Sequence, residues 1–78
     1  MKVLIIEDDW EIVEAISLAF QIRWPEANVV STNLGKKGVE LVESEAPDVV
    51  ILDLGLPDIN GFEVLRQIRL FSPVPPLS

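Results

Sequence analysis

Short apolar runs alternate with segments of helical spacing along the whole chain. The runs at 3–6, 27–31 and 48–52 predict three strands, and the first and third are apolar enough to be buried on both faces of a sheet. Helical spacing predicts helices at 10–24, 35–45 and 62–70, and Pro25 and Pro47 end the first two. The order βαβαβα predicts an α/β fold with a parallel sheet and helices on both faces.

The spacing also predicts which helix positions face the sheet and which residues begin the helices. Asp8 or Asp9 is expected to cap the first helix, and Thr32 or Asn33 the second. The expected inward positions are Ile12, Ile16, Ala19, Phe20 and Arg23 in the first helix, Val39, Val42 and Ala46 in the second, and Val64, Leu65 and Ile68 in the third.

Composition narrows the classes of function. Apolar residues make up 49% of the 78 positions and charged residues 24%, a globular balance. The chain has no cysteine and no histidine, which excludes Ser-His-Asp and Cys-His nucleophiles and the common zinc sites. A net charge of −7 argues against direct binding to nucleic acid or to an anionic membrane. There is neither a signal peptide nor an apolar run long enough to span a membrane, so we expect a cytoplasmic location.

Acidic residues follow two of the predicted strands. Glu7, Asp8 and Asp9 come directly after the first strand, and Asp53 follows the third. Because ligands of parallel sheets bind beyond the carboxyl ends of the strands, Glu7, Asp8 and Asp53 are expected to converge at one edge. Oxygen ligands without histidine or thiolate favour Mg²⁺. The alternative is that these acids only cap helices and form turns, which explains Asp9 better than Glu7.

The stretch at 48–61 (Asp-Val-Val-Ile-Leu-Asp-Leu-Gly-Leu-Pro-Asp, then Asn-Gly after one residue), with the acids at 7–9, resembles the receiver domain of two-component response regulators. The resemblance runs from residue 1 to about residue 69. It implies a flavodoxin-like (CheY-like) doubly wound parallel sheet and phosphoryl transfer from a sensor histidine kinase. It also implies that Asp53 accepts the phosphoryl group, Asp8 binds Mg²⁺ directly, Glu7 acts on the metal through water and Gly55 supplies a backbone carbonyl. Such a domain is a signalling acceptor rather than an enzyme.

The chain also departs from the family pattern. It holds about three of the five expected βα units, so we interpret residues 1–70 as the N-terminal part of a receiver and 71–78 as a Pro-rich tail or truncation remnant. The family's phosphate-binding lysine has no counterpart, since Lys36 and Lys37 fall at the start of the second helix. Ser78 falls too early to serve as the switch residue, and adjacent prolines argue against a fourth strand at 74–78.

Three further expectations follow. Without a fourth strand, 49–52 is an exposed apolar edge, which predicts self-association through that strand. The alternative function is therefore a phosphorylation-incompetent half-receiver that acts as a self-associating structural or interaction module. A phosphohydrolase working through an aspartyl phosphate is disfavoured, because such chemistry needs an acid two residues after the nucleophile and position 55 is glycine.

Overall fold

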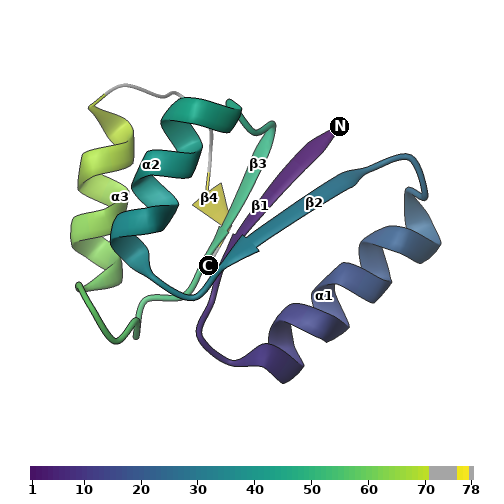
Figure 1. Ribbon diagram of the computed structural model, residues 1–78, viewed down its shortest axis with the longest axis horizontal. Helices are drawn as coiled ribbons and strands as arrows, with labels where there is room; N and C mark the ends of the chain where they lie inside the picture. The colour runs from purple at the N-terminus through teal and green to yellow at the C-terminus, as the bar shows by residue number, and fades with distance from the viewer. Residues whose placement is uncertain (71–75, 78) are drawn as a thin grey trace.

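The chain folds into a parallel sheet with helices on both faces (Figure 1). The computed structural model describes residues 1–70 and 76–77. The sheet has the strand order β2-β1-β3-β4. The elements in chain order are β1 (Lys2–Ile6), α1 (Trp10–Arg23), β2 (Asn28–Thr32), α2 (Gly35–Glu45), β3 (Val49–Leu52), α3 (Gly61–Arg69) and β4 (Pro76–Leu77). The predicted α/β class and βαβαβα order are confirmed. None of the helices in these residues is long and apolar enough to cross a membrane.

Strand β1 is the centre of the fold because its side chains reach both faces of the sheet. Leu4 and Ile6 pack with α2, α3 and the neighbouring strands, whereas Val3 and Ile5 pack under α1. All four are at most 1% exposed. This double burial explains why the strand is apolar throughout rather than alternating. Figure 1 shows α2 and α3 side by side on one face of the sheet and α1 on the other.

The inward face of α1 differs from the expected one. Val13 is buried, and Ile16 and Phe20 pack beside it against the sheet. Ile12 is 45% exposed, and Ala19 and Arg23 are exposed as well. Ile16 and Phe20 are thus confirmed as inward positions, whereas the other three expected positions are wrong. The reason is that α1 carries apolar residues around most of its circumference, so helical spacing alone does not single out the buried stripe.

The two other helices follow the sequence more closely. Val42, Val64 and Ile68 are buried, as expected, and Val39 and Leu65 pack against the same core. Ala46 is an exception, because it is exposed and ends α2 in the left-handed conformation, with φ of 46°. A helix commonly ends on such a residue, although glycine is the usual choice.

The third strand is not the bare edge that the sequence suggested. Strand β4 pairs with it in parallel, with Val50 opposite Pro76 and Ile51 opposite Leu77. The expectation of no fourth strand is therefore wrong, and residues 76–77 belong to the sheet rather than to a tail. An edge strand can hold a proline, because a nitrogen that faces away from its neighbour needs no hydrogen. Ser78 and the rest of the predicted tail, 71–75, lie outside the described residues.

Candidate functional site

The parallel pairing of β1 with β3 places two acidic segments at the same edge of the sheet. Ile6 lies opposite Leu52 at the ends of β1 and β3, so the residues that follow, Glu7 and Asp53, emerge next to each other. The Asp53 amide donates to the carbonyl of Ile6 at 2.9 Å, and the Glu7 amide donates to the carbonyl of Thr32 at 3.0 Å. The backbone of both acidic residues is therefore fixed by the ladder of the sheet.

The structure brings together Glu7, Asp8 and Asp53. One carboxylate oxygen from each lies within 4.8 Å of the others. Glu7 and Asp53 are half-buried and Asp8 is exposed. Asp9 takes no part, because its side chain caps α1 by accepting a hydrogen bond from the Glu11 amide at 3.0 Å. The expected convergence is present. Of the alternative, capping is found at Asp9, and Asp53 forms a turn hydrogen bond with the Gly55 amide in addition to its place in the group.

The pKa values of the two half-buried carboxyl groups, Glu7 and Asp53, are shifted in opposite directions. Partial burial, together with the hydrogen bond and the negative charge of Asp53, raises the pKa of Glu7 from 4.5 to about 7. The Gly55 amide is the main cause that lowers the pKa of Asp53, and hydrogen bonds with Glu7 and Asp8 add to it. Glu7 therefore holds a proton below about pH 7 and is about half protonated at neutral pH, while Asp53 stays ionised.

Gly55 contacts the site through its amide, which donates to Oδ1 of Asp53 at 3.0 Å. This contact fixes the rotation of the Asp53 side chain. The role expected for Gly55, a carbonyl ligand to a metal, stays a prediction.

The donor set suits a hard cation. All three side chains offer only carboxylate oxygen, and oxygen ligands are those that Mg²⁺ and Ca²⁺ prefer. Three acidic groups this close repel one another unless a proton or a cation lies between them. The pKa of Glu7 is raised mainly by partial burial and by the hydrogen bond with Asp53, and the negative charge of Asp53 adds to the rise.

Two grooves flank the carboxylates. A groove of about 390 Å³ lies between α1 and the end of β3, lined by Glu7, Ile12, Ile51, Leu52, Asp53 and Leu54. A second, of about 360 Å³, lies towards β2, lined by Glu7, Asp8, Trp10, Val13, Ser31, Thr32 and Asn33. The carboxylates are therefore open to solvent and to a small ligand from two sides.

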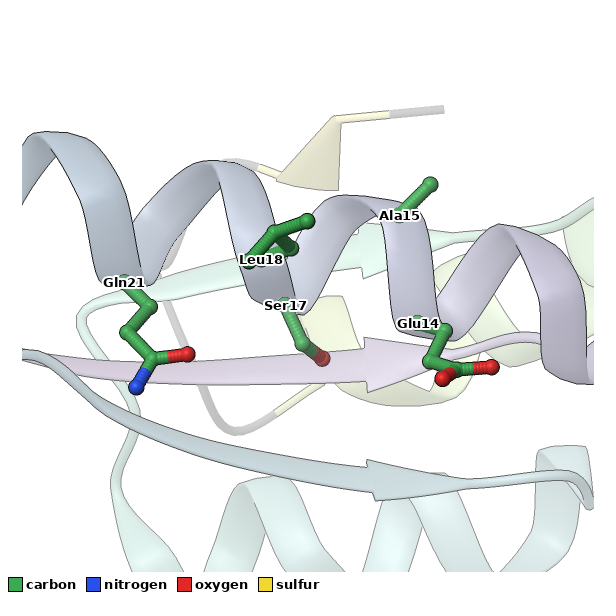
Figure 2. Close-up of a pocket in the computed structure, with 5 residues that line it drawn as sticks. All are labelled: Glu14, Ala15, Ser17, Leu18 and Gln21. Atoms are coloured by element: carbon green, nitrogen blue, oxygen red, sulfur yellow. The ribbon is translucent and has the colours of Figure 1, made fainter.

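A third groove, of about 360 Å³, lies along α1 and shares no lining residue with the carboxylates. Figure 2 shows its five lining side chains, all on α1: Glu14, Ala15, Ser17, Leu18 and Gln21. It holds one acidic group and no cluster of ligating side chains, so we assign the chemistry to the edge of the sheet instead.

Sequence reasoning missed Asp58. Its Oδ1 accepts a hydrogen bond from the Gly35 amide at 2.8 Å, and its Oδ2 accepts one from the Lys36 amide at 2.9 Å. The expectation that Thr32 or Asn33 caps α2 is wrong. Leu34 occupies the N-cap position and forms no side-chain hydrogen bond there. Two features of the sequence could have indicated a cap from elsewhere in the chain. Leu34 at the N-cap is apolar, and Asp58 in the loop after β3 has no expected role.

The two lysines of α2 lie where the sequence placed them. Lys36 and Lys37 are exposed in its first turn, and Lys37 forms an ion pair with Glu40 at 3.5 Å. Exposed pairs of this kind contribute little to stability.

Comparison with known proteins finds one family. The family model of the response regulator receiver domain matches residues 3–77. Cell cycle response regulator CtrA of Brucella ovis is 42% identical over 77 residues, which are 99% of this chain and 32% of that protein. The chain thus spans about a third of the length of the curated relatives it matches.

Solved structures of other proteins have the same fold. The N-terminal domain of an uncharacterized protein from Wolinella succinogenes has a TM-score of 0.82 at 35% identity, covering 96% of this chain and 59% of that one. The receiver domain of a Francisella response regulator has a TM-score of 0.85 at 25% identity, covering 96% of this chain and 61% of that one. The flavodoxin-like architecture expected from the sequence is confirmed.

Proposed function

The chain belongs to the response regulator receiver domain family, and on that basis we propose that Asp53 accepts a phosphoryl group from a sensor histidine kinase. The observation that carries the proposal is the grouping of Glu7, Asp8 and Asp53 within 4.8 Å at the carboxyl edge of the sheet. An ionised Asp53, oriented by the Gly55 amide, is the nucleophile that such a transfer needs.

The transfer itself makes one bond and breaks one. A carboxylate oxygen of Asp53 forms a bond to phosphorus, and the bond from phosphorus to the donor breaks, its electron pair leaving with the donor. The product is an aspartyl phosphate. Asp53 is fixed by the ladder of the sheet, so its oxygen meets the donor in a fixed direction.

We propose Mg²⁺ as the cofactor. Asp8 and Asp53 are the expected direct ligands, Glu7 acts through water, and Gly55 offers its carbonyl. A bound divalent cation neutralises negative charge on the transferring phosphoryl oxygens. The three carboxylate donors within 4.8 Å of one another support this assignment.

The domain acts in this proposal as a signalling acceptor and not as an enzyme. Position 55 is glycine, so Asp53 has no acid two residues later that would activate a leaving group. The curated relatives are described as cell cycle response regulators, and a regulatory role for a longer protein is supported by that likeness. We propose a cytoplasmic location for the domain, as the sequence leads us to expect.

Self-association as an interaction module is a second candidate function. Three large apolar side chains of α1 favour it, because Ile12, Leu18 and Ile22 are 45%, 56% and 75% exposed. Sedimentation velocity at rising concentration tests this candidate. A species larger than one chain is expected, weakened by Leu18→Glu, and a single monomeric species throughout would exclude it.

Phosphoryl transfer is tested by intact mass. The 78-residue chain is incubated with Mg²⁺ and acetyl phosphate beside two variants, Asp53→Asn and Asp9→Asn. Asp9 is a matched control, because it lies in the acidic segment but caps α1. We expect one added phosphoryl group in the native chain and in Asp9→Asn, and none in Asp53→Asn. No gain in a native chain that circular dichroism shows to be folded would contradict the proposal.

A further inference from the structure

The first turn of α2 is fastened to the loop that follows β3. We call residues 53–61 the acceptor loop. Asp58, in the middle of this loop, accepts hydrogen bonds from the first two amides of α2, those of Gly35 and Lys36, at 2.8 and 2.9 Å. The two segments are separated by 23 and 22 residues in the sequence, so this contact joins distant parts of the fold.

Asp58 caps α2 from a distant part of the chain, whereas most helices are capped by a residue just before them. The first amides of a helix have no partner within it, and a side chain just before the helix usually accepts from them. Leu34 occupies that place in α2 and has no side-chain oxygen. The amides of α2 are therefore satisfied by the acceptor loop, and any movement of the loop away from α2 leaves them without this partner.

Apolar packing reinforces the same contact. Gly35 is buried, and a Cβ atom there would lie 2.8 Å from Ile59 Cγ1 and 2.8 Å from Val64 Cγ2. It would also lie 3.1 Å from Leu56 Cδ1. Leu56 and Ile59 belong to the acceptor loop, so the loop rests directly on the first residue of α2. A side chain at position 35 would separate the two segments.

The ends of the acceptor loop are fixed at the site. The Gly55 amide donates to Asp53 Oδ1 at 3.0 Å, and the Gly61 amide donates to the Leu54 carbonyl at 3.1 Å. Between these two contacts, the Asp58 carboxylate links the loop to α2, whereas Asn60 caps α3 by accepting from the Phe62 amide at 2.7 Å. Gly55 is thus held on one side by Asp53 and, through the loop, by α2.

We propose that Asp58 is a positioning residue for phosphoryl transfer: its carboxylate fastens the acceptor loop to α2 and so keeps Gly55 in place against Asp53. The proposal rests on the proposed function of Asp53. The Lys36 and Gly35 amides also lower the pKa of Asp58, so the carboxylate stays charged and able to accept both hydrogen bonds over the physiological range.

Three variants separate positioning from a general effect on stability. Asp58→Ala removes the link. Asp58→Ala combined with Leu34→Asp gives α2 a cap at its own N-cap position, where the backbone is already extended, and keeps the net charge while leaving the loop unfastened. Asp48→Ala is the matched control, because Asp48 also accepts a backbone amide, that of Lys2 at 2.7 Å, outside the acceptor loop.

Besides the melting temperature, two measurements are made on each chain. The first is the initial rate of phosphoryl gain from acetyl phosphate with Mg²⁺. The second is amide hydrogen exchange at Gly55 and Gly61 by nuclear magnetic resonance, which needs no phosphoryl transfer. The double variant is expected to regain the melting temperature lost in Asp58→Ala. Its rate is nevertheless expected to stay about tenfold to a hundredfold below the native rate, because a small misplacement of reacting groups has effects of that size. Its Gly55 amide should exchange faster than in the native chain.

The outcomes are distinct. Native rate and native exchange in the double variant would overturn the positioning role and leave Asp58 as a cap of α2 only. A slow rate and fast exchange in Asp48→Ala would also overturn it, because the loop would then respond to any loss of stability. If the native chain gains no phosphoryl group, the proposed function fails and exchange at Gly55 alone decides the role of Asp58. Should Asp58→Ala fail to fold, Asp58→Asn, which keeps one accepting oxygen, is expected to give an intermediate exchange rate.

Discussion

Replacing Gly61 by alanine tests how tightly the loop after β3 is closed. A Cβ atom at position 61 would lie 2.3 Å from the Cα of Leu54 and 2.8 Å from the carbonyl oxygen of Asp53. Both are backbone atoms, so no rotation of a side chain relieves the overlap. The main chain beside Asp53 must shift, and the hydrogen bond from the Gly61 amide to the Leu54 carbonyl, 3.1 Å long, must lengthen.

The expected loss of stability follows from two opposing effects. Overpacking of this kind costs about 1–3 kcal/mol. Gly61 is the first residue of α3, and alanine there gains up to about 1 kcal/mol from its higher helix propensity. The net loss is about 1–2 kcal/mol, which lowers the melting temperature of a domain this small by about 5–15 °C.

The assay is urea unfolding followed by circular dichroism, with Gly55→Ala as the matched control. A Cβ atom at position 55 meets only Asp53 Oδ1, at 3.7 Å, which is an ordinary contact. We expect Gly55→Ala to change the free energy of unfolding by no more than about 0.5 kcal/mol. If Gly61→Ala were as stable as Gly55→Ala, the reasoning about loop closure would be refuted.

Two further predictions concern stability. Ala46→Gly should raise the free energy of unfolding by about 0.5–1 kcal/mol, because a side chain at φ of 46° is strained and glycine is not; an unchanged or lower urea midpoint would contradict this. Without metal, the free energy of unfolding should fall as pH rises from 4.5 to about 7, because folded Glu7 holds a proton that the unfolded chain has lost. The lowered pKa values of Asp53, Asp58 and Glu63 act below this window. Urea midpoints at pH 5 and 7.5 in a chelator measure the fall, and an equal fall in Glu7→Gln would refute its assignment to Glu7.

The sequence was enough to predict the elements that periodicity and position determine. Continuous apolar runs identified β1 and β3, and the acids after them led to the grouping of Glu7, Asp8 and Asp53. This succeeded because parallel strands end at one edge, so residues that follow equivalent strands meet without further information.

Other features depend on contacts that a linear pattern does not contain. The cap of α2 comes from Asp58, more than 20 residues away, so no local signal at Thr32 or Asn33 reveals it. Adjacent prolines, which lack donors, argue against a fourth strand in the sequence, although an edge strand needs donors on one side only. In α1, apolar residues on two sides hid the buried position of Val13.

We propose that Glu7, Asp8 and Asp53 together hold one divalent cation, with Asp53 also the phosphoryl acceptor. Isothermal titration calorimetry with MgCl₂ tests this binding, using the native chain and the variants Asp8→Asn, Asp53→Asn and Asp9→Asn. We predict saturable binding of one Mg²⁺ by the native chain and by Asp9→Asn, and a loss of at least about tenfold in affinity in each of the other two. Equal affinity in all four chains, or no saturable binding by a folded native chain, would contradict the claim.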